Sequence, residues 1–128
     1  MRQITQRASS SFLNKKPFKL GNTSVEVFHL AYGDKTSPVN EVTLKLHQNT
    51  IAEFNFIGRD LWFTLAGWNT PTTRERLNGL FQTMGLTAKI VQRNFELYLE
   101  TPTESVKIDA HGWYAIGGRA SEVQDFQA

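Results

Sequence analysis

The chain has 128 residues, a formal net charge of +2 at pH 7 and no cysteine. This length suits one domain with its own core, and the missing cysteine excludes a disulfide scaffold, a thiolate metal site and a cysteine nucleophile. No apolar run approaches membrane-spanning length and the first residues lack the apolar core of a secretory signal, so we expect a soluble cytoplasmic protein without membrane contact.

Residues 1–20 read as a basic helical arm. Residues 1–24 carry five basic and no acidic side chains, a charge of +5, whereas the rest of the chain sums to −3. A short helix is predicted before Pro17, with one side formed by Ile4, Ala8, Ser11 and Phe12. A basic arm suits nucleic acid or another polyanion, with Lys15 and Lys16 as candidate contacts. The competing interpretation, favoured by the modest charge density, is a solvated helix face.

From residue 22 the pattern changes to the period-two alternation of half-buried strands. The predicted strands cover 24–31, 42–47, 50–57 and 61–68. A hairpin turn at Gln48-Asn49 and a second turn at 57–60 join the last three strands into a meander. The last strand is apolar on both faces, through residues such as Trp62 and Trp68, so we expect a central position covered by a helix.

The segment 70–84 carries a complete set of helix signals. Either Thr70 caps the helix with Pro71 at the first position, or Thr72 caps it and forms a capping box with Glu75. The predicted apolar stripe consists of Leu77, Leu80, Phe81 and Met84. Such a stripe has to be buried, and the neighbouring strands are the expected partner.

Shorter strands are predicted after the helix. A hairpin around Arg93-Asn94 joins 87–92 to 95–100, with Phe95, Leu97 and Leu99 on one face, and further strands cover 106–108 and 113–116. The fold class is therefore α+β: a mainly antiparallel sheet of meander and hairpins, packed by one central helix, with a short N-terminal helix. We predict an arm at 1–20, a single domain at 21–116 and a flexible tail at 117–128.

Three motifs carry a resemblance to a known family. They are Arg2-Gln3-Ile4-Thr5-Gln6, Leu46-His47-Gln48-Asn49-Thr50-Ile51-Ala52 and Thr72-Thr73-Arg74-Glu75-Arg76-Leu77-Asn78. With them, most of residues 1–100 resembles a family of small bacteriophage proteins. Gln48 stands where that family usually has glycine, and the region after Glu100 matches less well. The resemblance implies a phage origin and action in the host cytoplasm, and it supplies no activity and no catalytic residues.

The start of the central helix is the best candidate binding site. Unpaired amides and the positive end of the helix dipole favour an anion there. Arg74 and Arg76 have no acidic residue three or four positions away, so they are free either to grip phosphate or to pair with sheet carboxylates such as Glu53 or Glu96. The candidate anion or partner contacts are Thr70, Thr72, Thr73, Arg74, Arg76 and Asn78, with Lys15 and Lys16 from the arm. The competing interpretation is that these threonines and arginines are ordinary helix residues.

Catalytic signals are weak. The three histidines have no metal-ligand spacing, serine nucleophile motifs and glycine-rich phosphate loops are missing, and we predict no metal and no cofactor. Asp109 and His111 share one face of an extended segment and are the acid-base candidates if the protein is an enzyme.

We therefore predict a small phage-encoded accessory protein that binds a host or phage partner, either protein or nucleic acid, without catalysis, in host takeover or anti-defence. The alternatives are a small nucleotide- or phosphodiester-directed enzyme and a virion or assembly component. We also predict a homodimer, because the arm is a weak helix on its own and Gly79, on the expected outward face of the central helix, invites close approach by another subunit.

Overall fold

The computed structural model describes residues 1–116 and 123–126. The helices are α1 (Gln3–Leu13) and α2 (Pro71–Thr83). The strands are β1 (Phe18–Leu20), β2 (Thr23–His29), β3 (Val39–Leu46), β4 (Asn49–Asn55), β5 (Leu61–Phe63), β6 (Lys89–Arg93), β7 (Glu96–Glu100), β8 (Ser105–Ile108), β9 (Trp113–Ile116) and β10 (Val123–Phe126). The fold is α+β with a short N-terminal helix and a central helix, as the sequence predicts.

The described strands form two antiparallel sheets. The larger has the order β1-β2-β3-β4-β5-β9-β10 and the smaller the order β6-β7-β8. The predicted meander is present as β3, β4 and β5, and β5 lies between β4 and β9, which confirms its central position. β5 ends at Phe63, however, and not at Trp68, because the chain turns away from the sheet after it.

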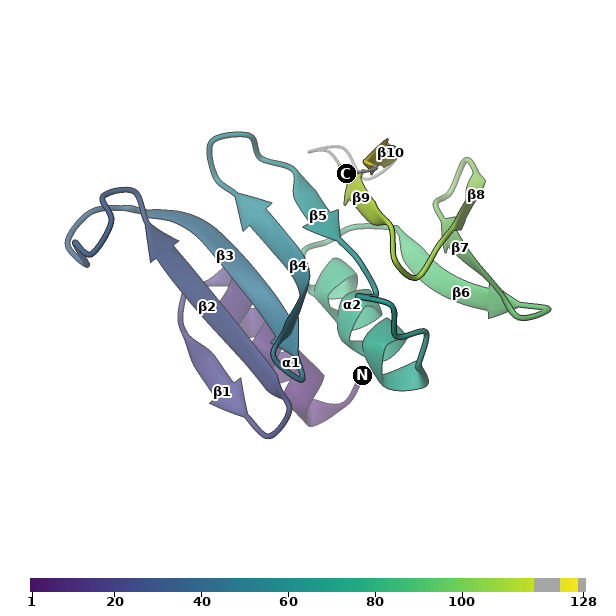
Figure 1. Ribbon diagram of the computed structural model, residues 1–128, viewed down its shortest axis with the longest axis horizontal. Coiled ribbons are helices and arrows are strands. Elements are labelled where there is room, and N and C mark those ends of the chain that lie inside the picture. Colours follow the sequence, from purple (N-terminus) through teal and green to yellow (C-terminus); the bar gives the residue numbers. More distant parts are fainter. Residues whose placement is uncertain (117–122, 127–128) are drawn as a thin grey trace.

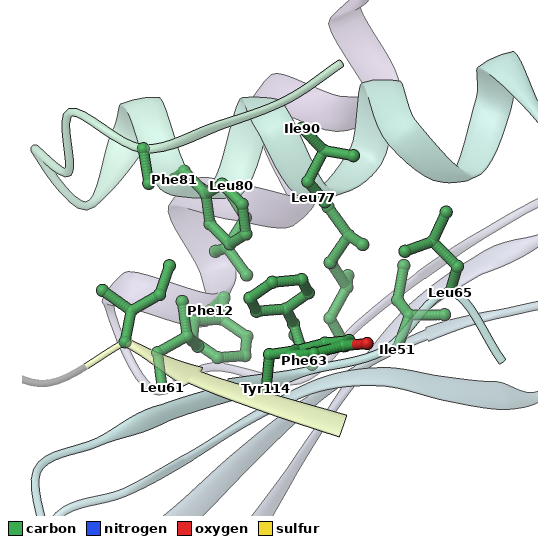
Figure 2. Packing of buried hydrophobic residues seen from close by; sticks show 14 of the residues in the cluster. Phe12, Ile51, Leu61, Phe63, Leu65, Leu77, Leu80, Phe81, Ile90 and Tyr114 are labelled. Carbon is green, nitrogen blue, oxygen red and sulfur yellow. The ribbon is translucent and has the colours of Figure 1, made fainter. Parts of the chain in front are cut away.

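Both helices cover the same face of the seven-stranded sheet (Figure 1). α1 contacts β1, β2 and β3, while α2 contacts β4 and the first strand of the smaller sheet. Figure 2 shows the helix residues Phe12, Leu77, Leu80 and Phe81 facing the sheet residues Leu61, Phe63 and Tyr114. The ring of Phe63 lies edge-on to that of Phe81, with their centroids 5.2 Å apart. The basic arm is therefore packed into the same core as the rest of the fold.

The buried side of α1 differs slightly from the prediction. Its buried residues are Thr5, Ala8, Ser9 and Phe12. Ile4 and Ser11, which the sequence pattern assigns to this side, are half-buried. The helix is rotated by part of a turn because Thr5 faces α2, where it takes part in a polar network described below.

α2 begins as the first of the two predicted arrangements. The Thr70 hydroxyl accepts a hydrogen bond of 3.2 Å from the Thr73 amide, and Pro71 occupies the first helical position. The alternative capping box does not form, because Glu75 turns to α1 instead. Leu77, Leu80 and Phe81 of the predicted stripe are buried, and Met84 is half-buried against the same core.

Two hairpin turns lie one residue away from their predicted positions. Residues His47 and Gln48, and again Asn94 and Phe95, have positive φ at both positions, as a two-residue turn of type I′ requires. The positive φ of 67° at Gln48 explains why the resembling family favours glycine there. The sequence predicts that Phe95 shares one face with Leu97 and Leu99. This prediction is wrong, because Phe95 lies in the turn and is 92% exposed.

Gly79 lies on the opposite side of α2 from its prediction. It is buried against α1, where an added Cβ would lie 2.3 Å from the Cγ2 methyl of Thr5. The close approach that the glycine permits is therefore between two helices of the same chain. Gly79 faces α1 and not a second subunit as predicted, so it does not support a homodimer, and dimerisation stays a prediction.

The predicted flexible tail, residues 117–128, contains β10, which pairs with β9. The rest of that tail, at 117–122 and 127–128, lies outside the described residues. Within the described part of the chain, neither helix combines the length and the apolar character needed to cross a bilayer.

Candidate functional site

An apolar hollow lies between the β3–β4 hairpin and the start of α2. Its volume is about 440 Å³. It is lined by Leu46, His47, Asn49, Ile51, Leu65, Ala66, Trp68, Thr70, Thr72 and Thr73. Trp68 lines the hollow while 62% of its side chain is exposed to solvent. We refer to this site as the Trp68 hollow.

The loop between β5 and α2 places Trp68 in this position. Ala66 and Gly67 have φ of 55° and 84°, so the chain turns sharply just before the tryptophan. The Gly67 amide donates a hydrogen bond of 2.9 Å to the Ala110 carbonyl. The His111 ring packs directly on this glycine, since an added Cβ would lie 2.8 Å from ring atom Cε1. Glycine is required here by both the backbone angle and the close ring.

The first turn of α2 offers an anion fewer amides than the sequence suggests. Pro71 has no N–H, the Thr73 amide donates to the Thr70 hydroxyl and the Arg74 amide donates to the Thr70 carbonyl. In the part of the chain that the structure describes, the Thr72 amide is then the one left to meet a ligand in this turn. Helix N-termini that hold phosphate present several amides at once, so this one is a weak anion site.

Arg74 and Asn78 link α2 to its neighbours. The Arg74 guanidinium donates to the Asn69 side chain and, over 2.9 Å, to the Gln92 side chain. Asn78 donates to the Ile90 carbonyl at 2.9 Å and accepts from the Ile90 amide at 2.7 Å. β6 is an edge strand of the smaller sheet, and these two bonds satisfy the backbone groups of Ile90 in place of a neighbouring strand. Asn78 therefore attaches the smaller sheet to α2.

Arg76 is 2% exposed and holds three elements together. Its Nε donates to the Thr23 hydroxyl of β2 at 3.0 Å, and its Nη1 donates to the Thr5 hydroxyl of α1 at 2.8 Å. Nη1 also forms an ion pair of 2.5 Å with the carboxylate of Glu75. The prediction that Arg76 is free to bind phosphate or a sheet carboxylate is wrong, because its charge is paired with the adjacent Glu75 and its other donors bond to two residues distant in sequence.

Glu75 completes the same network. Burial alone would raise its pKa, but hydrogen bonds from the Thr5 hydroxyl, the Arg2 amide and Arg76 outweigh this effect and lower the pKa. The carboxylate therefore stays ionised and balances the buried guanidinium. Neither predicted partner, Glu53 or Glu96, takes part.

The two lysines of the arm lie away from the start of α2. They follow the far end of α1, and the Lys15 ammonium lies 4.3 Å from the centre of the Phe56 ring, a cation–π contact. Lys16 is exposed. The candidate contacts from the arm and from α2 are thus not gathered into one site.

The acid-base candidates also have structural neighbours. The Asp109 carboxylate accepts a hydrogen bond of 2.7 Å from the His111 amide, which closes a local turn. The Asp109 amide in turn donates to the Tyr114 hydroxyl at 2.7 Å. Among the described residues, no three histidine or carboxylate side chains are placed to hold a metal ion.

The sequence profile of the Kyanoviridae Gp96 protein family matches residues 1–120. The chain belongs to this family. The match confirms the resemblance to a family of phage proteins and extends past residue 100, where the motifs are weaker. No curated protein and no solved structure matched the chain.

In this member of the Kyanoviridae Gp96 protein family, the residues that line the Trp68 hollow include three candidate contacts predicted from the sequence, Thr70, Thr72 and Thr73. The sequence did not predict that its apolar lining residues belong to a site. The sequence pattern places Trp68 in a strand because the run from residue 61 carries apolar residues on both faces. The one local signal against that assignment is the dipeptide Ala66-Gly67, since a glycine within a strand pattern often marks a bend.

Proposed function

We propose that this phage protein acts without catalysis, by binding a protein of the host or of the phage through the Trp68 hollow. The observation that carries the proposal is an exposed tryptophan on an apolar hollow of about 440 Å³. We place this accessory role in the host cytoplasm, in host takeover or anti-defence.

Tryptophan is well suited to anchor a protein interface. It contributes a large rigid apolar surface at a low cost in conformational entropy, and it is enriched among residues whose truncation weakens binding most. The leucine and isoleucine walls of the hollow provide space for an apolar side chain of the partner beside the indole ring. Burying such a side chain gives about 1.5–3 kcal/mol.

The positions of the cationic groups favour a protein partner over nucleic acid. Arg76 is buried, Arg74 is bonded to Asn69 and Gln92, and Lys15 lies on the Phe56 ring. Phosphate binding would have to break these contacts or rely on scattered charges. Binding to nucleic acid depends on several cations that face the backbone together.

A wider hollow of about 1010 Å³ beside the β1–β2 hairpin is less suited to anchor a partner. Its walls include Lys19, Glu26, Lys45 and His47. The ammonium of Lys45 already pairs with the carboxylate of Glu26 at 2.9 Å. This hollow has no large exposed aromatic side chain among its lining residues, whereas the Trp68 hollow does.

A comparison of two exposed aromatic residues tests the proposal. Tagged full-length wild-type protein, Trp68→Ala and Phe95→Ala are each expressed in infected cells, and captured proteins, nucleic acids and nucleotides are identified together. A captured protein is then purified and titrated against all three forms. We expect Trp68→Ala to weaken binding about tenfold or more, by loss of a central aromatic contact. Phe95→Ala, at an exposed hairpin tip, should bind like the wild type.

Two outcomes would overturn the proposal. Equal binding by all three forms would remove the Trp68 hollow as the site. Capture of nucleic acid or a nucleotide alone, with an affinity that falls steeply as salt rises, would support the nucleic-acid or nucleotide alternative instead.

A further inference from the structure

The face of the seven-stranded sheet opposite the helices carries polar and charged side chains. Figure 1 shows β2, β3 and β4 with α1 behind them, and no described helix crosses their front. One row across this face consists of Glu26, Thr43, Glu53 and Trp62, which are direct neighbours on adjacent strands. We refer to this surface as the open sheet face.

Thr43 is the central residue of this row. Its chain neighbours Val42 and Leu44 are buried under the helices, so the alternation of β3 directs Thr43 to the open sheet face. It is 5% exposed, and its hydroxyl oxygen has no hydrogen-bond partner among the described residues. A buried hydroxyl without a hydrogen-bond partner destabilises the fold, so a ligand that bonds to it gains an advantage.

One other buried hydroxyl lacks a described partner, that of Ser9. It lies on the side of α1 that also carries Ala8 and Phe12 and is packed into the core. A ligand reaching Ser9 would have to separate α1 from the fold. Thr43 differs because the alternation of β3 directs it away from both helices.

Two carboxylates beside Thr43 have no cationic partner among the described residues. Glu26 is neutralised by Lys45, but no described ion pair includes Glu41 or Glu53. Glu41 lies on β3 and Glu53 on β4, in diagonal positions of one face, where neighbouring residues are about 7–8 Å apart and within reach of long side chains. Burial, and next the charge of Glu41, raise the pKa of Glu53. An added cation at this point would relieve the repulsion.

We propose that the open sheet face binds an arginine side chain of a partner protein between Glu41 and Glu53, with the Thr43 hydroxyl as a further acceptor. The proposal shares with the proposed function the idea that the partner is a protein, but it does not depend on the Trp68 hollow. It adds a second contact surface and names the chemistry that this surface recognises.

A guanidinium suits this site better than an ammonium does. Its five N–H donors are fixed in one plane, so one group can serve two carboxylates and a hydroxyl at the same time. Trp62, the direct neighbour of Glu53, adds an aromatic side chain to the same row. Lysine offers a compact charge that is more strongly hydrated.

The test uses the full-length protein and two short synthetic peptides, one containing arginine and one in which citrulline replaces each arginine. Citrulline keeps the shape and removes the charge. Binding is followed by nuclear magnetic resonance of the backbone amides at low and moderate salt. We expect the arginine peptide to shift the amide resonances of Glu41, Thr43 and Glu53. The citrulline peptide should bind at least about tenfold more weakly.

Variants with matched charge separate a specific site from general attraction. Glu53→Gln should weaken the arginine peptide about tenfold, whereas Glu104→Gln, an exposed position in the β7–β8 turn with the same change of charge, should have no effect. Thr43→Val removes the unpartnered hydroxyl with little change of shape. It should weaken the peptide without lowering the melting temperature, since no described hydrogen bond is lost.

Three results would overturn the proposal: no binding of the arginine peptide at low salt, equal binding of the citrulline peptide, or equal effects of Glu53→Gln and Glu104→Gln. Trp68→Ala keeps the two proposals apart. The arginine peptide should bind Trp68→Ala as it binds the wild type, because Trp68 is not part of the open sheet face. If the peptide binds in this way but the captured protein binds Trp68→Ala and the wild type equally, the open sheet face is supported and the Trp68 hollow is not. If the captured protein depends on Trp68 but the arginine peptide does not bind, the Trp68 hollow alone is supported.

Discussion

The two faces of the seven-stranded sheet treat polar side chains in opposite ways. On the covered face, Arg76 is 2% exposed, yet its guanidinium bonds to Thr5, Thr23 and Glu75. On the open sheet face, the hydroxyl of Thr43 has no described partner. The two groups are almost equally buried, but only the first is paired.

The difference separates side chains that build the fold from side chains available to a partner. A buried guanidinium is tolerable only when its charge and its donors are satisfied, so the network around Arg76 has no spare capacity for a ligand. Thr43 and the carboxylate of Glu53 do have such capacity. Arg76 therefore serves the interior of this fold, while the open sheet face offers groups that an arginine of a partner would satisfy.

The strongest test of the covered face is Arg76→Met. Methionine fills a similar length but leaves Glu75, Thr5 and Thr23 without their shared donor, so we expect a loss of about 3–5 kcal/mol in the free energy of unfolding. Denaturant titration measures this loss directly.

Arg74→Met is the matched control on the same helix. Arg74 is only half-buried and bonds to two neutral side chains, so its loss should cost less than about 1 kcal/mol. Similar losses for the two variants would mean that the Arg76 network is not what holds α1, α2 and β2 together.

A smaller effect is expected at the contact between the helices. Gly79→Ala improves helix propensity by about 1 kcal/mol, but its Cβ would meet the methyl of Thr5 at 2.3 Å. Thr5 cannot move aside easily because its hydroxyl is bonded to both Glu75 and Arg76. We expect a net loss of about 1–3 kcal/mol in unfolding free energy, the usual cost of overpacking.

The double variant Thr5→Ser, Gly79→Ala checks the cause of that loss. Serine keeps the hydroxyl and removes the methyl, so most of the stability lost in Gly79→Ala should return, as a double-mutant cycle would show. Gly58→Ala is the control, because nothing lies within 4 Å of an added Cβ there. A Gly79→Ala protein more stable than the wild type would place α1 farther from α2.

Features set by neighbours in sequence were predictable. The buried stripe of Leu77, Leu80 and Phe81 and the three-strand meander follow from local spacing, and the cap at Thr70 is one of the two arrangements that the sequence offers. These signals need only a few consecutive residues. The same reasoning extended β5 as far as Trp68, because an apolar run does not reveal where a strand leaves its sheet.

Features set by distant residues were not predictable. The partner of Arg76 in α1 is 71 positions away in sequence and its partner in β2 is 53 positions away. Gly79 faces inward because α1 occupies that side of α2, which no pattern within α2 reveals. The helical wheel of α2 marks Arg76 as a border of the stripe and Gly79 as an outward-facing position, and the packing of a second helix buries both residues.

The smallest predicted effect compares one carboxylate on each face, Glu53 and Glu75, by replacing each with glutamine. The pKa of Glu53 is raised above its ordinary 4.5, so its ionised form costs stability above the raised pKa, and this cost disappears as the pH falls through it. The pKa of Glu75 is lowered below 4.5, so its ionised form adds stability above 4.5 that is lost as the pH falls through the lowered value.

Near pH 7 we therefore expect Glu53→Gln to melt at a higher temperature than the wild type and Glu75→Gln at a lower one. Both differences in melting temperature from the wild type should shrink as the samples are acidified: the positive one of Glu53→Gln and the negative one of Glu75→Gln both approach zero. Thermal melts across the acidic range measure them. If Glu53→Gln melted at a lower temperature than the wild type near pH 7, Glu53 would have a stabilising partner in the fold. Its carboxylate would then not be available to bind an arginine of a partner. A more stable Glu53→Gln that also binds the arginine peptide less well would show that this carboxylate is kept for binding at a cost to the fold.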